Sequence, residues 1–214
     1  MEIITIYPRG FGSNTYVLTE DNKTAIVIDP AQTRVESELI KRGLSPKYVL
    51  LTHCHFDHVG GVAALQEGGA RVLCSDAEKP LVGTDADACD LIGAPRMHYR
   101  VDETFTDGEE KELGGIRVKM ILTPGHTAGS ACYLITAKDG GMYLFTGDTL
   151  FAGSIGRTDL PTGNIGQLRA SLRKLLALDG DYPVYAGHDD PSGLNDGPTT
   201  LDRERKTNPY ILDL

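Results

Sequence analysis

The chain has 214 residues, of which 40% are hydrophobic, and a formal net charge of −9. This length fits one large domain or two small ones with a sizeable core. The acidic balance argues against binding to nucleic acid or to an anionic membrane surface, because both need a basic face. The sequence has no apolar stretch long enough to span a bilayer and no secretory signal, so we expect a cytoplasmic protein.

The four cysteines are Cys54, Cys74, Cys89 and Cys132. None of them forms a CxxC pair, whereas a structural zinc site needs close pairs of thiolates or histidines at two places. We therefore expect four reduced and mostly buried thiols, with no disulfide and no zinc–thiolate site.

Short apolar runs alternate with helical patterns along the first half of the chain. Strands are predicted at 2–8, 14–20, 24–29, 47–51 and 71–75, and helices at 33–42 and 59–67. The first helix is predicted because Val35, Leu39 and Ile40 share one face and Gly43 is a typical stop. The strand at 47–51 leads directly into a stretch rich in histidine.

The second half begins with a polar, irregular segment at 76–103, where we expect a surface excursion with short helical turns. Further strands are predicted at 110–113, 116–122, 130–136, 142–147 and 182–187, and helices at 165–178 and 199–206. Two strand-rich halves with outer helices predict an α/β fold. Its expected form is a four-layer αββα sandwich in a single domain over residues 1–214.

Seven acid or imidazole side chains follow the C-terminal ends of predicted strands: His53, His55, Asp57, His58, His126, Asp148 and His188. Functional groups concentrate where a rigid scaffold meets its loops. A lone histidine there is usually a satisfied polar residue, and Asp57 could simply cap the next helix. The whole set, with four members inside THCHFDHVGG at 52–61, is instead typical of metal ligands.

Local geometry predicts how the side chains of this stretch face. Alternate side chains share a side in an extended segment, so His53 and His55 face one way and Cys54 the other. Asp57 and His58 come where the chain turns into a helix and can point to a neighbouring spot. This predicts two adjacent metal positions, which the two oxygens of Asp148 could bridge.

Imidazole and carboxylate ligands without thiolate fit two divalent metal ions, zinc in the first place, with iron or manganese as alternatives. Two such ions a few ångströms apart can share a water and lower its pKa, so that hydroxide exists near neutral pH. No serine or cysteine nucleophile is then required. Asp57 is the predicted catalytic residue, because it would hold the hydroxide as well as a metal.

The motifs THCHFDHVGG, TPGHTAGS, FTGDTLF and AGH, in this order, resemble those of the metallo-β-lactamase fold superfamily. The segment GDTLFAGSIGRTDLPTGN and the ending ERKTNPY are similar to the glyoxalase II-like hydroxyacylglutathione hydrolases. The resemblance covers nearly the whole chain. It implies one metal at His53, His55 and His126, a second at Asp57, His58 and His188, and Asp148 as the bridge.

The resemblance also implies roles for three residues outside the ligand set. Asp29 matches a position near the site and would orient the ligands, although an Asp before Pro30 can also simply form a turn. Arg157 matches a basic position that binds the carboxylate of the thiol cofactor, and its alternative is an ion pair with Asp159 or another acid. Asn14 matches an early segment beside the site and is expected to bind substrate.

Two features depart from the glyoxalase II pattern. Those enzymes continue past this ending into helices with basic residues that hold glutathione, whereas this sequence ends in NPYILDL, so we expect no strong preference for glutathione. The stretch Asp189–Pro198 is longer than in the family and carries three acids. It is either a rim element that changes substrate choice or a harmless surface insertion.

The leading hypothesis is a dinuclear thioesterase that acts on an S-(2-hydroxyacyl)glutathione-like thioester through a metal-bridging hydroxide. The alternatives are a mononuclear iron persulfide dioxygenase, a phosphodiesterase of the same superfamily, and a metal-binding protein without activity. A β-lactamase role is disfavoured by the missing export signal. The expected partner is a small-molecule thioester, with no nucleic acid and no membrane, and the protein is expected to be a monomer or a small homo-oligomer.

Overall fold

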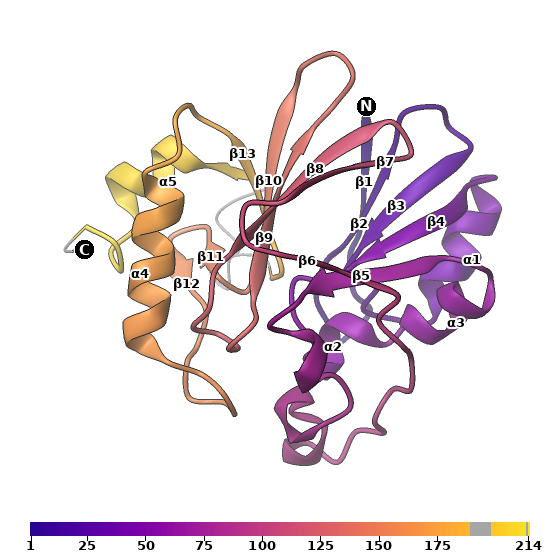
Figure 1. The fold of residues 1–214 in the computed structure, drawn as a ribbon, viewed down its shortest axis with the longest axis horizontal. Coiled ribbons are helices and arrows are strands. Elements are labelled where there is room, and N and C mark those ends of the chain that lie inside the picture. The colour runs from indigo at the N-terminus through magenta and orange to yellow at the C-terminus, as the bar shows by residue number, and fades with distance from the viewer. Residues whose placement is uncertain (189–197, 213) are drawn as a thin grey trace.

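The structure is a computed structural model, and it describes residues 1–188, 198–212 and 214. Two six-stranded sheets lie face to face, and helices cover the outer face of each sheet (Figure 1). None of the helices in these residues is long and apolar enough to cross a membrane.

The first sheet has the order β1-β2-β3-β4-β5-β6. Its strands are β1 (Glu2–Ile6), β2 (Thr15–Thr19), β3 (Thr24–Ile28), β4 (Ser45–Leu50), β5 (Arg71–Ser75) and β6 (Glu103–Phe105). Strands β3 to β6 are parallel, so helices α1 (Arg34–Lys41) and α3 (Val62–Glu67) return the chain along the outer face. Parallel strands end at the same edge of a sheet, which brings the residues after β3 and β4 together there.

The second sheet has the order β14-β13-β10-β9-β8-β7. Its strands are β7 (Glu110–Leu113), β8 (Ile116–Leu122), β9 (Ala131–Thr136), β10 (Met142–Gly147), β13 (Pro183–Ala186) and β14 (Thr199–Thr200). Strands β10 and β13 are parallel and are linked through α4 (Ile165–Leu176), and α5 (Leu201–Thr207) follows β14. A small hairpin of β11 (Leu150–Phe151) and β12 (Ser154–Ile155) lies between β10 and α4 in the sequence.

Three clusters of buried side chains fill the spaces between the layers. In β3, Val27 packs with Leu39 of α1, whereas Ile26 and Ile28 point to the core between the sheets. On the far side, Leu144 of β10 packs with Leu168 of α4. The predicted α/β fold with four αββα layers is confirmed, and the core shared by the two sheets makes it one domain.

The chain differs from the predicted elements mainly after β4. The predicted helix at 59–67 is wrong in its start, because a short helix α2 (Phe56–Val59) comes first and α3 begins only at Val62. The break lies at Gly60 and Gly61, where added Cβ atoms would lie 2.3 Å from the carbonyl oxygen of Ala31 and 2.6 Å from that of Gln32. This close approach anchors α2, and with it Asp57 and His58, against the turn after β3.

Candidate metal centre

The structure brings together all seven acid and imidazole side chains that the sequence singles out. We call them the His/Asp cluster: His53, His55, Asp57, His58, His126, Asp148 and His188. Four of them come from the segment after β4, and the others follow β8, β10 and β13. The strand ends of the two sheets thus meet at one place.

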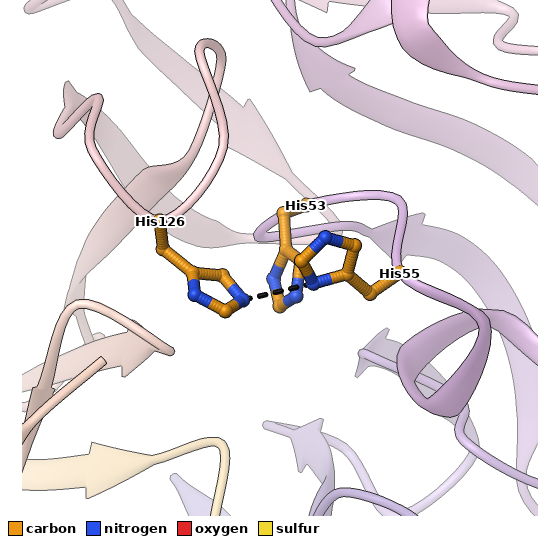
Figure 2. A group of neighbouring side chains, drawn as sticks. All are labelled: His53, His55 and His126. Carbon is orange, nitrogen blue, oxygen red and sulfur yellow. Dashed lines mark hydrogen bonds between the residues drawn. The ribbon is translucent and has the colours of Figure 1, made fainter. Parts of the chain in front are cut away.

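The first group in the cluster is His53, His55 and His126, whose ligand atoms all lie within 4.8 Å of one another. Figure 2 shows His126 on one loop, with His53 and His55 on a second segment and the three rings pointing toward one another. Nε2 of His126 lies 2.9 Å from Nδ1 of His55. Three imidazoles at this spacing match the first metal position that the sequence predicts.

The second group is Asp57, His58 and His188, with the same spacing. Oδ2 of Asp57 lies 3.2 Å from Nε2 of His188. Asp57 and His58 are in α2, which fits the expectation that the turn into a helix directs them to a neighbouring spot.

Asp148 lies between the two groups. Its Oδ1 lies 3.3 Å from Nε2 of His58, and its Oδ2 lies 3.4 Å from Nε2 of His126 and 3.5 Å from Nε2 of His188. One carboxylate therefore faces both groups, which is the position that a bridging ligand requires.

Four buried polar atoms of the described residues have no hydrogen-bond partner: Nε2 of His53, His55 and His58, and Oδ1 of Asp148. All of them belong to the His/Asp cluster. An unpaired buried polar atom costs about 1–3 kcal/mol, and native proteins rarely keep one without a reason. Several together, all aimed at one space, fit divalent metal ions as their missing partners.

The protonation states of His53, His55 and Asp148 suit metal binding. Burial lowers the pKa of His53 well below its ordinary value and that of His55 to about 3, so both rings are neutral and offer a lone pair. Burial alone would raise the pKa of Asp148, but the neighbouring His58 and His188 hold it well below its usual range. Asp148 is therefore a carboxylate.

Asp29 holds the ring of His58 from behind. Its buried carboxylate accepts hydrogen bonds from the backbone N–H of Thr52 at 2.8 Å and from the Thr52 hydroxyl at 2.6 Å, and it lies 2.9 Å from Nδ1 of His58. This contact directs Nε2 of His58 toward Asp148, as expected of a residue that orients a ligand. Asp29 also has a φ of 48°, so the backbone takes a left-handed conformation directly before Pro30.

Cys54 lies in the same segment but does not join the groups of metal-binding geometry among the described residues. Its side chain is buried, and burial raises the pKa of the thiol, which therefore stays protonated. These observations agree with the predicted alternation, in which Cys54 faces away from its histidine neighbours.

Replacement of Cys54 by alanine should leave the metal content unchanged, because a protonated thiol that faces away cannot be a ligand. Elemental analysis of the purified Cys54→Ala variant beside the parent chain measures this. A loss of metal in this variant would mean that the segment is not extended through residues 53–55.

Sequence reasoning missed Glu78, a fully buried residue in the irregular segment after β5. Its Oε1 accepts a hydrogen bond of 2.7 Å from the backbone N–H of Cys54, and its Oε2 accepts one of 2.7 Å from the Thr127 hydroxyl. Cys54 lies between His53 and His55, and Thr127 follows His126. One carboxylate thus joins the two segments that carry the first group, which no local sequence pattern reveals.

Gly187 is a second residue that was not singled out, although it precedes His188 in the motif AGH. A Cβ atom at this position would lie 2.2 Å from Oδ1 of Asp148 and 2.8 Å from Cε1 of His58. Only glycine leaves room for both side chains, so its presence beside a ligand is the signal that could have found it.

Substitution of Gly187 by alanine should push Asp148 and His58 apart and lower the metal affinity by roughly 10–100-fold, the loss typical of disturbed ligand support. Competition with a chelator of known affinity measures the change. Gly166→Ala, in α4, is the matched control, because there a Cβ atom would meet only Oδ1 of Asn164 at 3.3 Å. Equal affinities of both variants would contradict the tight packing at Gly187.

A cavity of about 570 Å³ opens above the cluster, and His55, Asp57 and Asp148 line it. Arg157 also lines this cavity, but its guanidinium forms two hydrogen bonds of 2.7 Å with Asp159. The ion pair given as the alternative is thus present, and a contact of Arg157 with substrate stays a prediction. Through its backbone oxygen, 2.8 Å from Nδ1 of His126, Arg157 also supports the first group.

Asn14 does not line the cavity in the described part of the chain, and its role in binding substrate stays a prediction. Its side chain is buried, and its Nδ2 lies 3.5 Å from the carbonyl oxygen of Ala186. Its backbone N–H donates to the carbonyl oxygen of Gly187 at 2.7 Å. Asn14 therefore supports the strand end that carries His188.

The predicted rim element Asp189–Pro198 lies, except for Pro198, outside the described residues.

Comparison with known proteins places this geometry in a family. The family model of the metallo-beta-lactamase superfamily matches residues 8–188. The chain is also 34% identical over 218 residues to the hydroxyacylglutathione hydrolase GloC of Haemophilus influenzae, covering 99% of this chain and 98% of that protein.

Solved structures agree with these sequence matches. The crystal structure of the BLEG-1 B3 metallo-beta-lactamase superposes with a TM-score of 0.85 at 31% identity, covering 98% of this chain and 99% of that one. ETHE1 from Myxococcus xanthus superposes with a TM-score of 0.79 at 28% identity, covering 100% of this chain and 85% of that one. TTHA1623 in a di-iron-bound form superposes with a TM-score of 0.78 at 32% identity, covering 98% of this chain and 100% of that one. With the family model matching most of its length and a relative similar from end to end, the chain belongs to the metallo-beta-lactamase superfamily.

Proposed function

We propose that the protein is a dinuclear metal-dependent hydrolase of thioesters of the S-(2-hydroxyacyl)glutathione type. The observation that carries the proposal is the position of Asp148 between two groups of ligand atoms, each within 4.8 Å. The similarity to GloC over nearly the full length of both chains supports the thioester as substrate class. The cavity of about 570 Å³ above the cluster has room for a small thioester.

The first group would hold one metal ion, the second group would hold another, and Asp148 would contact both. When bound, the two ions supply Lewis acidity, which polarises a carbonyl group and lowers the pKa of water. Zinc is the first choice for these ligands. The similarity to TTHA1623 in a di-iron-bound form supports iron as the alternative.

The chain's own residues position the reactants. Although burial would raise the pKa of Asp57, its neighbours His58 and His188 lower it, so the side chain is a carboxylate at neutral pH. It lines the cavity and can accept a hydrogen bond from an attacking water and thereby orient it. Asp29 and the carbonyl group of Arg157 keep the rings of His58 and His126 in place. The protonated thiol of Cys54 faces away, so it is not the nucleophile.

The test is hydrolysis of S-lactoylglutathione and of other acyl thioesters by protein loaded separately with zinc, iron or manganese. Loss of the thioester absorbance gives the rate. The proposal expects turnover with about two equivalents of metal per chain. It fails if no thioester is cleaved while a carboxylic ester, a β-lactam or a phosphodiester is cleaved.

A second candidate is the mononuclear iron persulfide dioxygenase, which the similarity to ETHE1 over the whole chain favours. It needs a single iron ion, held by two histidines of the cluster and Asp148. Elemental analysis together with oxygen consumption on glutathione persulfide separates the two candidates. One iron per chain with oxygen uptake supports the dioxygenase, and two metals with thioester turnover support the hydrolase.

A further inference from the structure

Large apolar side chains line the cavity from both halves of the chain, with Phe151, Ile155 and Leu160 in the second half. We call those from the first half the apolar wall: Phe11, Phe56, Leu91 and Ile92. Phe56 stands between His55 and Asp57 in the sequence, so the wall begins directly beside the His/Asp cluster. The remaining members come from the loop before β2 and from the irregular segment after β5.

The wall is exposed to solvent to an unusual degree. Phe11 is 73% exposed, Leu91 is 61% exposed and Ile92 is 58% exposed. Single apolar side chains at a surface are common, but several that line one cavity mark a binding site. The rings of Phe11 and Phe56 stack with their centroids 5.6 Å apart and their planes 9° apart, which gives a flat aromatic surface before any ligand arrives.

Charged contacts fix the segment that carries Leu91 and Ile92. The guanidinium of Arg96 lies 3.2 Å from Asp85, 2.6 Å from Asp87 and 3.1 Å from Asp90. These pairs join the two ends of the segment that contains Leu91 and Ile92, and Cys89 within it is buried. The apolar side chains are therefore held outward by a built structure, and little ordering entropy remains to be lost on binding.

The same cavity has few cationic side chains that could bind an anionic thiol part of a substrate. Among its described lining residues, Arg157 is the one lysine or arginine, and Asp159 already neutralises its charge through two hydrogen bonds. Recognition of the two carboxylates of glutathione would need unpaired cations. The energy available for substrate binding comes instead from apolar surface.

We propose that the apolar wall binds the acyl part of the substrate, and that the preferred substrates are thioesters with a long aliphatic or an aromatic acyl group. This inference rests on the thioester hydrolysis of the proposed function and changes the preferred acyl and thiol groups, because a thioester carbonyl at the cluster sends the two parts in opposite directions. Phe56 of the wall stands between His55 and Asp57 in the sequence, so an acyl group whose carbonyl lies at the cluster can extend along the wall. The thiol part then extends toward the ion pair of Arg157 with Asp159, which suits a neutral thiol.

The experiment uses the metal-loaded full chain and N-acetylcysteamine thioesters of one homologous series, from butanoyl through hexanoyl and octanoyl to decanoyl. Because each buried methylene contributes about 0.8 kcal/mol, kcat/KM should rise about fourfold per added methylene until the wall is covered. The double variant Leu91→Ser/Ile92→Ser should flatten this rise, and both side chains are exposed enough for the fold to tolerate the change. Ile40→Ser is the matched control, because Ile40 is 70% exposed on α1 and does not line the cavity.

A second measurement is independent of turnover. Octanoate should bind to the metal-loaded chain in isothermal titration calorimetry with a negative heat-capacity change, and the double variant should weaken this binding at least tenfold. If the parent chain hydrolyses the thioesters but kcat/KM does not rise with acyl length, the wall does not bind the acyl part, and the proposed function is unaffected. If no thioester is hydrolysed, the proposed function fails. Octanoate binding that depends on Leu91 and Ile92 then still supports the wall, and absence of binding overturns it.

Discussion

The Asp148→Ala variant should lose both metal ions and at least roughly 10³-fold in kcat/KM, which corresponds to about 4 kcal/mol of transition-state stabilisation. The reason is its central place, because its two oxygens lie 3.3–3.5 Å from nitrogen atoms that belong to both groups. Elemental analysis after dialysis gives the metal content, and the rate on S-lactoylglutathione gives the activity.

Asp57→Ala is the comparison that makes this result specific. Asp57 belongs to the second group alone, so this variant should keep one metal ion per chain while losing most of the activity. If Asp148→Ala retained two ions, its position between the groups would not be that of a bridging ligand. If Asp57→Ala lost both ions, the two positions would not be separate.

Replacement of Glu78 by alanine should lower the free energy of unfolding by about 3 kcal/mol, since two buried donors lose their acceptor and a cavity remains. Glu78→Gln keeps the shape and should cost about 1 kcal/mol. Because Glu78 joins the two segments of the first group, Glu78→Gln should also lower metal affinity by roughly 10–100-fold. Denaturant unfolding and chelator competition measure the two effects separately.

Glu204→Gln is a matched control for Glu78. Glu204 is also a buried carboxylate, and it accepts hydrogen bonds from Gly153, Thr199 and Asn208, none of which belongs to the His/Asp cluster. Its substitution should reduce stability without changing metal affinity. If both variants changed metal affinity equally, Glu78 would have only a general structural role.

The four-layer fold and the approach of the His/Asp cluster residues to one another can both be predicted from the sequence, and for the same physical reason. Strand patterns are local, and parallel neighbours such as β3 with β4, or β10 with β13, end at one edge. Residues placed directly after these strands, such as Asp29, His53 and Asp148, are therefore expected to lie near one another. This expectation does not require the conformation of the loops to be known. The direction of His55 relative to Cys54 follows in the same way from strand alternation.

Contacts between distant loops could not be predicted. Glu78 acts on residues that are 24 and 49 positions away, and nothing in the polar segment around it distinguishes it from the acids nearby. The apolar wall joins Phe11 with Leu91, two residues of separate loops whose approach depends on the whole first half. The break before α3 likewise depends on the carbonyl oxygen of Ala31, which no helix pattern contains.

The ligands of the cluster extend from position 53 to position 188, and they come from both sheets. During synthesis on the ribosome, a nascent chain that has emerged only as far as β10 carries the whole first group but lacks Asp148 and His188, so the second group is incomplete. Metal capture at both positions must therefore follow nearly complete folding, because the last ligand arrives after β13. Binding of both ions would therefore require that the two sheets have already assembled, so activity would be confined to folded chains.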